Sequence, residues 1–183
     1  VYGFIRKAEL INTSAGDCRI TLLDGIQNVM PYGVASDLQR ATSNLVDAYK
    51  RTELEPDSGM GIFALSAIIV DKAEPSEALK ANTAWSFGLE NPTRLLSSRQ
   101  LALFRSKQKV CGESDVKGER GAYFLVSEVS LPAGAAKKWA IVANVNQGHS
   151  QIVSLAQSIK EDKDIGRRVQ KDIDEGTKNL VRL

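Results

Sequence analysis

Acidic side chains are the strongest candidates for chemistry in this sequence. They gather in three stretches: Asp47, Glu53, Glu55 and Asp57; Asp71, Glu74 and Glu77; Glu113, Asp115 and Glu119. An enzyme that cleaves glycosidic bonds needs one or two carboxyl groups held at a defined separation, one of them protonated as a general acid. However, basic residues alternate with these carboxylates, which is typical of solvated strand faces and turns. We therefore expect structural roles for them and assign no catalytic residue.

Histidine, glycine and cysteine patterns indicate no further chemistry. His149, the single histidine, precedes an expected helix, where a lone polar residue usually serves as a cap. Neither a Walker loop nor a strand-linked GxGxxG motif is present, so a nucleotide is not expected. Cys18 and Cys111 are far apart and form neither a zinc motif nor a disulfide framework. We expect two free thiols, no metal and no cofactor.

The stretch LLDGIQNVMPYGV (residues 22–34) combines polar side chains with turn-forming residues. Pro31 fixes its own backbone, whereas Gly25 and Gly33 permit turns that other residues resist. The stretch suits either a polar binding rim or a tightly turned connection between strands. A second loop, VKGERGAYF (residues 116–124), places Glu119 and Arg120 between glycines before an expected strand, either as charged rim residues or as a local ion pair.

Trp85 and Trp139 alternate with small or polar neighbours in two expected strands. Each could stack on a sugar ring if exposed, or fill a core if buried. Burial in the core is the default for such residues.

Composition favours one main domain. The chain has 183 residues with 43% hydrophobic content, which is enough to bury a substantial core. Its net charge of +2 gives no reason to expect nucleic acid or an acidic membrane as a partner. The longest apolar run, residues 62–70, is less than half of the ~20 residues that a membrane-spanning helix needs, so it predicts a buried strand. The chain begins without methionine and ends inside a helical pattern, so we expect a piece of a longer protein.

The pattern of the first 147 residues predicts a mainly antiparallel β domain. We expect a β-hairpin in residues 2–22, because apolar residues alternate on both sides of the turn sequence NTSAGD. Further strands are expected at 45–54, 62–70, 81–87, 121–131 and 138–145, with short helices at 36–44 and 97–107. The glycines of DSGMG (residues 57–61) would join two of these strands as a hairpin. Residues 71–80 are expected to form a polar loop or a single helical turn.

The last part of the chain differs in kind. Ile152, Leu155, Ala156 and Ile159 mark one amphipathic helix, and the residues Ile165, Val169, Ile173 and Leu180 mark a longer one. We therefore divide the chain into a β domain, residues 1–147, and a helical linker, residues 148–183. The apolar face of the longer helix is expected to be incompletely covered.

The order of these elements resembles the amino-terminal region of cellobiose phosphorylase-like glycoside phosphorylases. The resemblance lies in NTSAGDCRITLLDGIQNVMPYGV (residues 12–34), in DAYKRTELEP (residues 47–56), and in WAIVANVNQGHSQIVSLAQSIKED, where a last strand passes into helices. In that family a β-super-sandwich is followed by a helical linker and an (α/α)6 barrel. The resemblance implies an antiparallel β-super-sandwich with one or two short helices, followed by linker helices.

The resemblance also implies a role. The general acid of that family belongs to the barrel, so no catalytic residue carries over to this chain. We expect a non-catalytic domain of a large carbohydrate-active enzyme, a phosphorylase or a hydrolase, whose partners are the barrel and, through it, carbohydrate. A second copy of the chain is a further expected partner. Amide and carboxylate groups form hydrogen bonds with the hydroxyl groups of sugars. The candidate substrate-rim residues are therefore Asp24, Gln27, Asn28, Tyr32, Glu119 and Arg120.

Two other hypotheses remain open. An autonomous carbohydrate-binding or interaction module would expose Trp85, Trp139 or Tyr32 as a stacking platform. A small self-sufficient glycosidase would hold two facing carboxyl groups in a cleft, roughly 5 to 10 Å apart.

Overall fold

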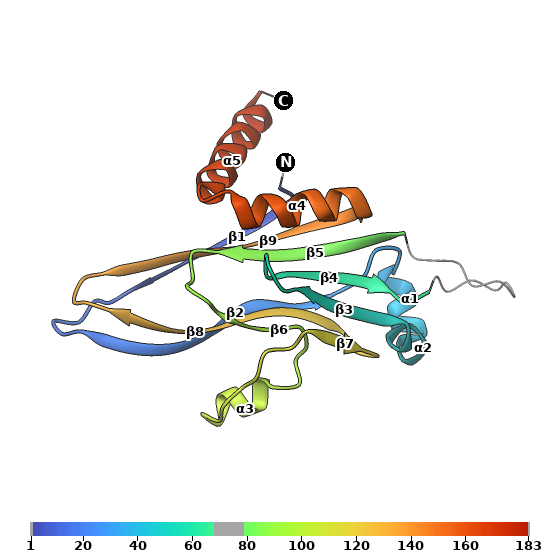
Figure 1. Cartoon of the computed structure of the whole chain (residues 1–183), viewed down its shortest axis with the longest axis horizontal. Coiled ribbons are helices and arrows are strands. Elements are labelled where there is room, and N and C mark those ends of the chain that lie inside the picture. Colours follow the sequence, from blue (N-terminus) through green and yellow to red (C-terminus); the bar gives the residue numbers. More distant parts are fainter. Residues whose placement is uncertain (1, 68–78, 183) are drawn as a thin grey trace, which may run out of the picture.

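A computed structural model describes residues 2–67 and 79–182 of the protein, and it shows two antiparallel β-sheets stacked on each other (Figure 1). The larger sheet has six strands in the order β1-β9-β5-β4-β3-β7, and the smaller has three in the order β2-β8-β6. The strands are β1 (Phe4–Ile11), β2 (Cys18–Val29), β3 (Lys50–Glu55), β4 (Met60–Leu65), β5 (Lys80–Phe87), β6 (Thr93–Leu95), β7 (Asp115–Lys117), β8 (Gly121–Leu131) and β9 (Ala136–Gly148). The expected mainly β, antiparallel fold is confirmed.

The described residues also form five helices, which lie around the sheets. Their bounds are α1 (Ser36–Ala41), α2 (Ser43–Ala48), α3 (Leu101–Arg105), α4 (His149–Glu161) and α5 (Ile165–Val181). In Figure 1, α1 and α2 lie at one end of the sheets and α3 lies beside the smaller sheet. Helix α4 runs along the larger sheet, and α5 rises away from it. The two helices predicted for the last part of the chain are confirmed.

The first core lies between the two sheets. Phe63, Tyr123, Leu125, Trp139 and Ile141 pack there and are almost completely buried. They come from β4, β8 and β9, so both sheets contribute. Burial of such large apolar side chains is the main source of stability in a fold of this kind.

A second core covers the opposite face of the larger sheet. Met60, Trp85 and Val142 point from β4, β5 and β9 towards α5, where Ile165 and Val169 meet them. Because neighbouring side chains of a strand point to opposite faces, the larger sheet is buried on both sides. The helices therefore form a third layer over this sheet.

The expected hairpin of residues 2–22 is wrong. β1 pairs with β9 in the larger sheet, and β2 pairs with β8 in the smaller one. The turn between β1 and β2 is thus a corner that passes from one sheet to the other, as is the turn between β8 and β9. Alternation of apolar residues identifies a strand, but it does not identify the strand's partner.

Several element boundaries also differ from the prediction. The strand expected from residue 45 begins at Lys50, because Ser43–Ala48 form α2 and bury Val46 against Val34 and Leu65. The helix expected at 97–107 is limited to α3, and the three-residue strands β6 and β7 were not predicted. The hairpin of β3 and β4 is confirmed. Residues 68–70 of the expected 62–70 strand and residues 71–78 of the following segment, with Asp71, Glu74 and Glu77, lie outside the described residues.

Candidate functional site

Asp24, the first rim candidate, lies between the two sheets. Its Oδ2 accepts hydrogen bonds of 2.7 Å from Arg6 Nη1 and of 2.7 Å from Trp139 Nε1. Burial alone would raise the pKa of Asp24, but these hydrogen bonds and the attraction of the Arg6 guanidinium outweigh it, and the pKa is lowered. The contacts of Asp24 join β1, β2 and β9, so its carboxylate is used for cohesion of the sandwich.

Four rim candidates lie near one end of the smaller sheet. The register pairs Gln27 of β2 with Ala122 of β8, which places Gln27 and Asn28 beside the loop that carries Glu119 and Arg120. Gln27 Nε2 donates to Ser98 Oγ at 2.8 Å, and Glu119 pairs with Arg99. Arg120 Nε lies 3.8 Å from Asp47 Oδ2.

Tyr32 is the exposed aromatic residue among the rim candidates, with 41% of its surface accessible. The ammonium group of Lys80 lies 5.2 Å from the centroid of its ring, within the range of a cation–π contact. Trp85 and Trp139 are 0% and 8% exposed and belong to the two cores. Neither tryptophan can serve as a stacking platform in this fold.

Several other carboxylates of the described segments stabilise turns and strand pairs. Glu113 accepts hydrogen bonds from the backbone N–H groups of Leu96, at 2.7 Å, and Ser97, at 2.8 Å. Glu55 accepts a 2.7 Å hydrogen bond from the backbone N–H of Ser58 in the β3–β4 turn. Burial acts to raise the pKa of Glu55, yet the Ser58 hydrogen bonds prevail and lower it.

Asp115 illustrates a strand pair of this kind. In the β3–β7 ladder Asp115 lies opposite Glu53 and diagonal to Arg51. Arg51 Nε lies 3.0 Å from Asp115 Oδ1, and the hydrogen bond from Arg51 lowers the pKa of Asp115. His149 is the first residue of α4, and the thiols of Cys18 and Cys111 are free.

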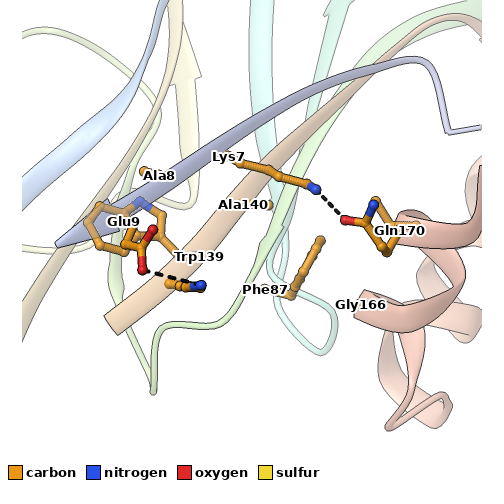
Figure 2. Close-up of a pocket in the computed structure, with 10 residues that line it drawn as sticks. Lys7, Ala8, Glu9, Phe87, Trp139, Ala140, Gly166 and Gln170 are labelled. Atoms are coloured by element: carbon orange, nitrogen blue, oxygen red, sulfur yellow. Dashed lines mark hydrogen bonds and ion pairs between the residues drawn. The ribbon is translucent and has the colours of Figure 1, made fainter. Parts of the chain in front are cut away.

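A groove of about 490 Å³ lies where α5 begins, above the outer face of the larger sheet (Figure 2). Its floor is Ala140 of β9. The strand register places Lys7 of β1 on one side of Ala140 and Phe87 of β5 on the other. Because alanine is short and both neighbours are long, a hollow remains between them. Gly166, Val169 and Gln170 of α5 close one wall.

Polar groups lie on both sides of this hollow. Lys7 Nζ donates a hydrogen bond to Gln170 Oε1, and Lys138 Nζ lies 3.2 Å from Glu9 Oε1 (Figure 2). Glu9 and Lys138 are direct partners in the β1–β9 ladder. The groove thus combines an aromatic ring with two amines, one carboxylate and one amide.

Sequence reasoning missed this groove. Lys7 and Glu9 alternate with apolar residues near the start of the chain, whereas Lys138 and Gln170 lie more than a hundred residues later. The charged residues Lys7 and Glu9 on one face of the strand were the signal that could have indicated a polar surface there. Only the pairing of β1 with β9, however, brings this strand close to Lys138 and the residues that follow it.

Within residues 2–67 and 79–182, no helix is long and apolar enough to cross a membrane. The same residues contain no cluster of three or more histidine, cysteine or acidic side chains that could hold a metal ion. The sequence matches no protein-family model and has no significant match among curated proteins.

Proposed function

We propose that this chain is a non-catalytic β-sandwich domain, with its helices, of a large carbohydrate-active enzyme of the glycoside phosphorylase type. Its role is to hold and orient a neighbouring domain. The class of enzyme rests on the resemblance of residues 12–34, 47–56 and the β9–α4 passage to cellobiose phosphorylase-like proteins. The structural role rests on the packing of α5.

The observation that carries the proposal is the unequal burial of α5. Ile165 and Val169 in its first half are 7% and 0% exposed against the larger sheet, whereas Leu180 and Val181 at its end are 71% and 82% exposed. The helix is anchored at one end and extends away from the sheets at the other (Figure 1). An anchored helix with an exposed apolar end suits a contact with another domain or with a second copy of the chain.

The contacts of the carboxylates support the non-catalytic part of the proposal. Four carboxylates accept hydrogen bonds or form ion pairs that join elements of the fold: Asp24, Glu55, Glu113 and Asp115. A general acid in a glycosidase needs a raised pKa. The pKa values of Asp24, Glu55 and Asp115 are shifted in the opposite direction.

An assay of the purified chain tests the proposal. We expect no release of product from cellobiose or aryl β-glucosides, with or without phosphate. Turnover that survives repurification and is abolished by Glu119→Gln would overturn the proposal. Glu128→Gln, which alters an exposed ion pair with Arg19 on the smaller sheet, is the matched control.

The gene sequence around this segment gives an independent test. A helical-barrel sequence of several hundred residues after Leu183 supports the proposal, whereas a stop codon there contradicts it. With a stop codon, an autonomous carbohydrate-binding module becomes the better hypothesis. In that case the open groove beside α5, which contains Phe87, is the better candidate for the binding surface, because both tryptophans are buried.

A further inference from the structure

We propose that the groove between β1, β9 and the start of α5 binds a single sugar ring that carries a carboxylate, such as a uronic acid unit. This goes beyond the proposed function, which assigns no ligand to this surface. The inference rests on the chemistry of five side chains that line the groove: Lys7, Glu9, Phe87, Lys138 and Gln170.

Phe87 supplies the apolar surface. Gly166 packs against this ring so closely that a Cβ atom added to it would lie 3.0 Å from Phe87 Cε2. With one part of the ring held by α5, the remainder lines the groove beside Ala140. An aromatic ring next to a few polar groups is the usual pattern for a small-molecule site, and it suits the apolar C–H face of a sugar.

The spacing of the strands limits the size of the ligand. Lys7 and Phe87 belong to strands on either side of β9, so their backbones lie about 10 Å apart. That span accommodates one six-membered ring with its substituents. The Glu9 carboxylate accepts hydrogen bonds from hydroxyl groups, and the Gln170 amide can both donate and accept them.

The balance of charge selects an acidic sugar. Lys138 is paired with Glu9, whereas Lys7 contacts the neutral Gln170 amide, and no carboxylate in the described part of the chain pairs with its amine. The groove therefore carries two positive charges and one negative charge. A carboxylate on the ligand would gain a charge-assisted hydrogen bond from Lys7, which is stronger than a neutral one.

A titration of the ¹⁵N-labelled chain followed by NMR tests this inference with three probes: methyl β-glucuronide, methyl β-glucoside and benzoate. We expect amide shifts centred on residues 7–9, 138–140 and 166–170. The glucuronide should bind about tenfold more tightly than the neutral glucoside, the difference expected for one hydrogen bond to a charged group. Benzoate should bind more weakly than the glucuronide, because it has no hydroxyl groups.

Two variants with matched controls make the result specific. Lys7→Gln should remove the preference for the glucuronide, while Lys178→Gln on the exposed end of α5 should preserve it. Gly166→Ala should weaken both sugars, because its methyl group pushes against Phe87. Gly176→Ala in the same helix has open space around it and should change nothing.

Three outcomes would overturn the inference: no shifts at high millimolar sugar, shifts centred elsewhere, or benzoate that binds as tightly as the glucuronide. None of them depends on turnover, so a failure here is distinguishable from a failure of the proposed function.

Discussion

Asn12 shows how one side chain closes an end of the sandwich. It is 5% exposed, and its Nδ2 donates to the carbonyl groups of Gly16, Leu131 and Pro132 at 2.8 to 3.0 Å. Its backbone exchanges hydrogen bonds with the β8–β9 turn, through Gly134 and Ala135. Both corners that pass between the sheets thus depend on this residue.

Replacing Asn12 should therefore destabilise the whole fold. We expect Asn12→Ala to cost about 2–4 kcal/mol of unfolding free energy, because one buried and two partly buried carbonyl groups lose their donor. Asn12→Asp should cost at least as much, since a carboxylate cannot donate to carbonyl groups. Urea denaturation measures both. Asn179→Ala, an exposed position on α5, is the control, and equal midpoints for Asn12→Ala and the control would contradict the prediction.

Asp24 leads to a prediction about pH. Its pKa in the folded protein is lower than in the unfolded chain, so its contribution to stability is complete above the unfolded value of about 3.9 and is lost as the pH falls through the folded value. Asp24→Asn should cost about 1–3 kcal/mol at neutral pH, because it breaks a partly buried ion pair.

The cost of Asp24→Asn should stay constant from about pH 6 to about pH 4 and should shrink as the pH falls further, from about 4 to about 2, because the wild-type carboxylate then becomes protonated in the folded protein. Unfolding free energies of both proteins across that range measure the difference. Asp37→Asn, at an exposed position in α1, provides the baseline. A difference that is constant with pH would exclude the ion pair as its source.

Among single residues, the sequence allowed the burial of Trp85 and Trp139 to be predicted, because apolar residues in strands are usually core residues. It did not reveal the role of Asn12 or Asp24. Asn12 was interpreted as part of a turn and Asp24 as a rim residue, because Leu131, a partner of Asn12, and Trp139, a partner of Asp24, lie far along the chain and only the fold brings them near.

At the scale of elements, α5 combines an anchored half and a free half. If residues 148–183 are a separable linker, their removal should leave the sheets intact. The burial of Ile165 and Val169 against Trp85 and Met60 predicts otherwise for the first half of the helix. A short helix is only marginally stable in isolation, and within a protein most of its stability comes from such packing.

Two truncations distinguish these halves. Removal of residues 175–183 should change the unfolding free energy by less than about 0.5 kcal/mol, because residues 175–182, the part of this segment that the structure describes, are exposed. Removal of residues 163–183 should destabilise the chain strongly, because it uncovers Trp85. Calorimetry measures both, and an unchanged melting temperature for the longer deletion would show that α5 is separable.

Point variants give the same comparison with less disturbance. Val169→Ala should cost about 1–3 kcal/mol, because it leaves a cavity at a fully buried site. Val181→Ala, at an exposed site in the same helix, is the matched control. Similar stabilities of the two variants would contradict the anchored first half.

Most strands and both final helices were predictable from periodicity, which is a property of the local sequence. The pairing of β1 with β9 and of β2 with β8 was not, because it joins segments separated by more than ninety residues. The groove beside α5 was not predictable for the same reason, since Lys7, Phe87 and Gln170 meet only after β9 has paired with β1 and β5. The short strands β6 and β7 carry too few residues to show a period.

At the scale of the whole molecule, β9 couples the two cores. Ile141 points between the sheets and Val142 points under the helices, so neither core can lose its packing without disturbing the same strand. The two tryptophans report on the two cores separately, because Trp139 belongs to the first and Trp85 to the second. The chain contains no other tryptophan.

Single-tryptophan variants test whether the molecule unfolds as one unit. Trp85→Phe leaves the fluorescence of Trp139, and Trp139→Phe leaves that of Trp85. We expect the fluorescence midpoint in urea to coincide with the midpoint from circular dichroism for each variant, as in a two-state transition. A fluorescence change of Trp85 at lower urea than the loss of β-structure would indicate that the helices detach first.

The ladder between β1 and β9 also governs when this protein can fold during its synthesis. Phe4 faces Ala143 and Ile11 faces Ala136, so the first strand has no partner until well over a hundred further residues have left the ribosome. Contacts between such distant residues slow folding, because a long loop must close before they form. The nascent chain therefore carries β1 and β2 unpaired until β8 and β9 have been synthesised, and unpaired strands of this kind are prone to associate with other chains.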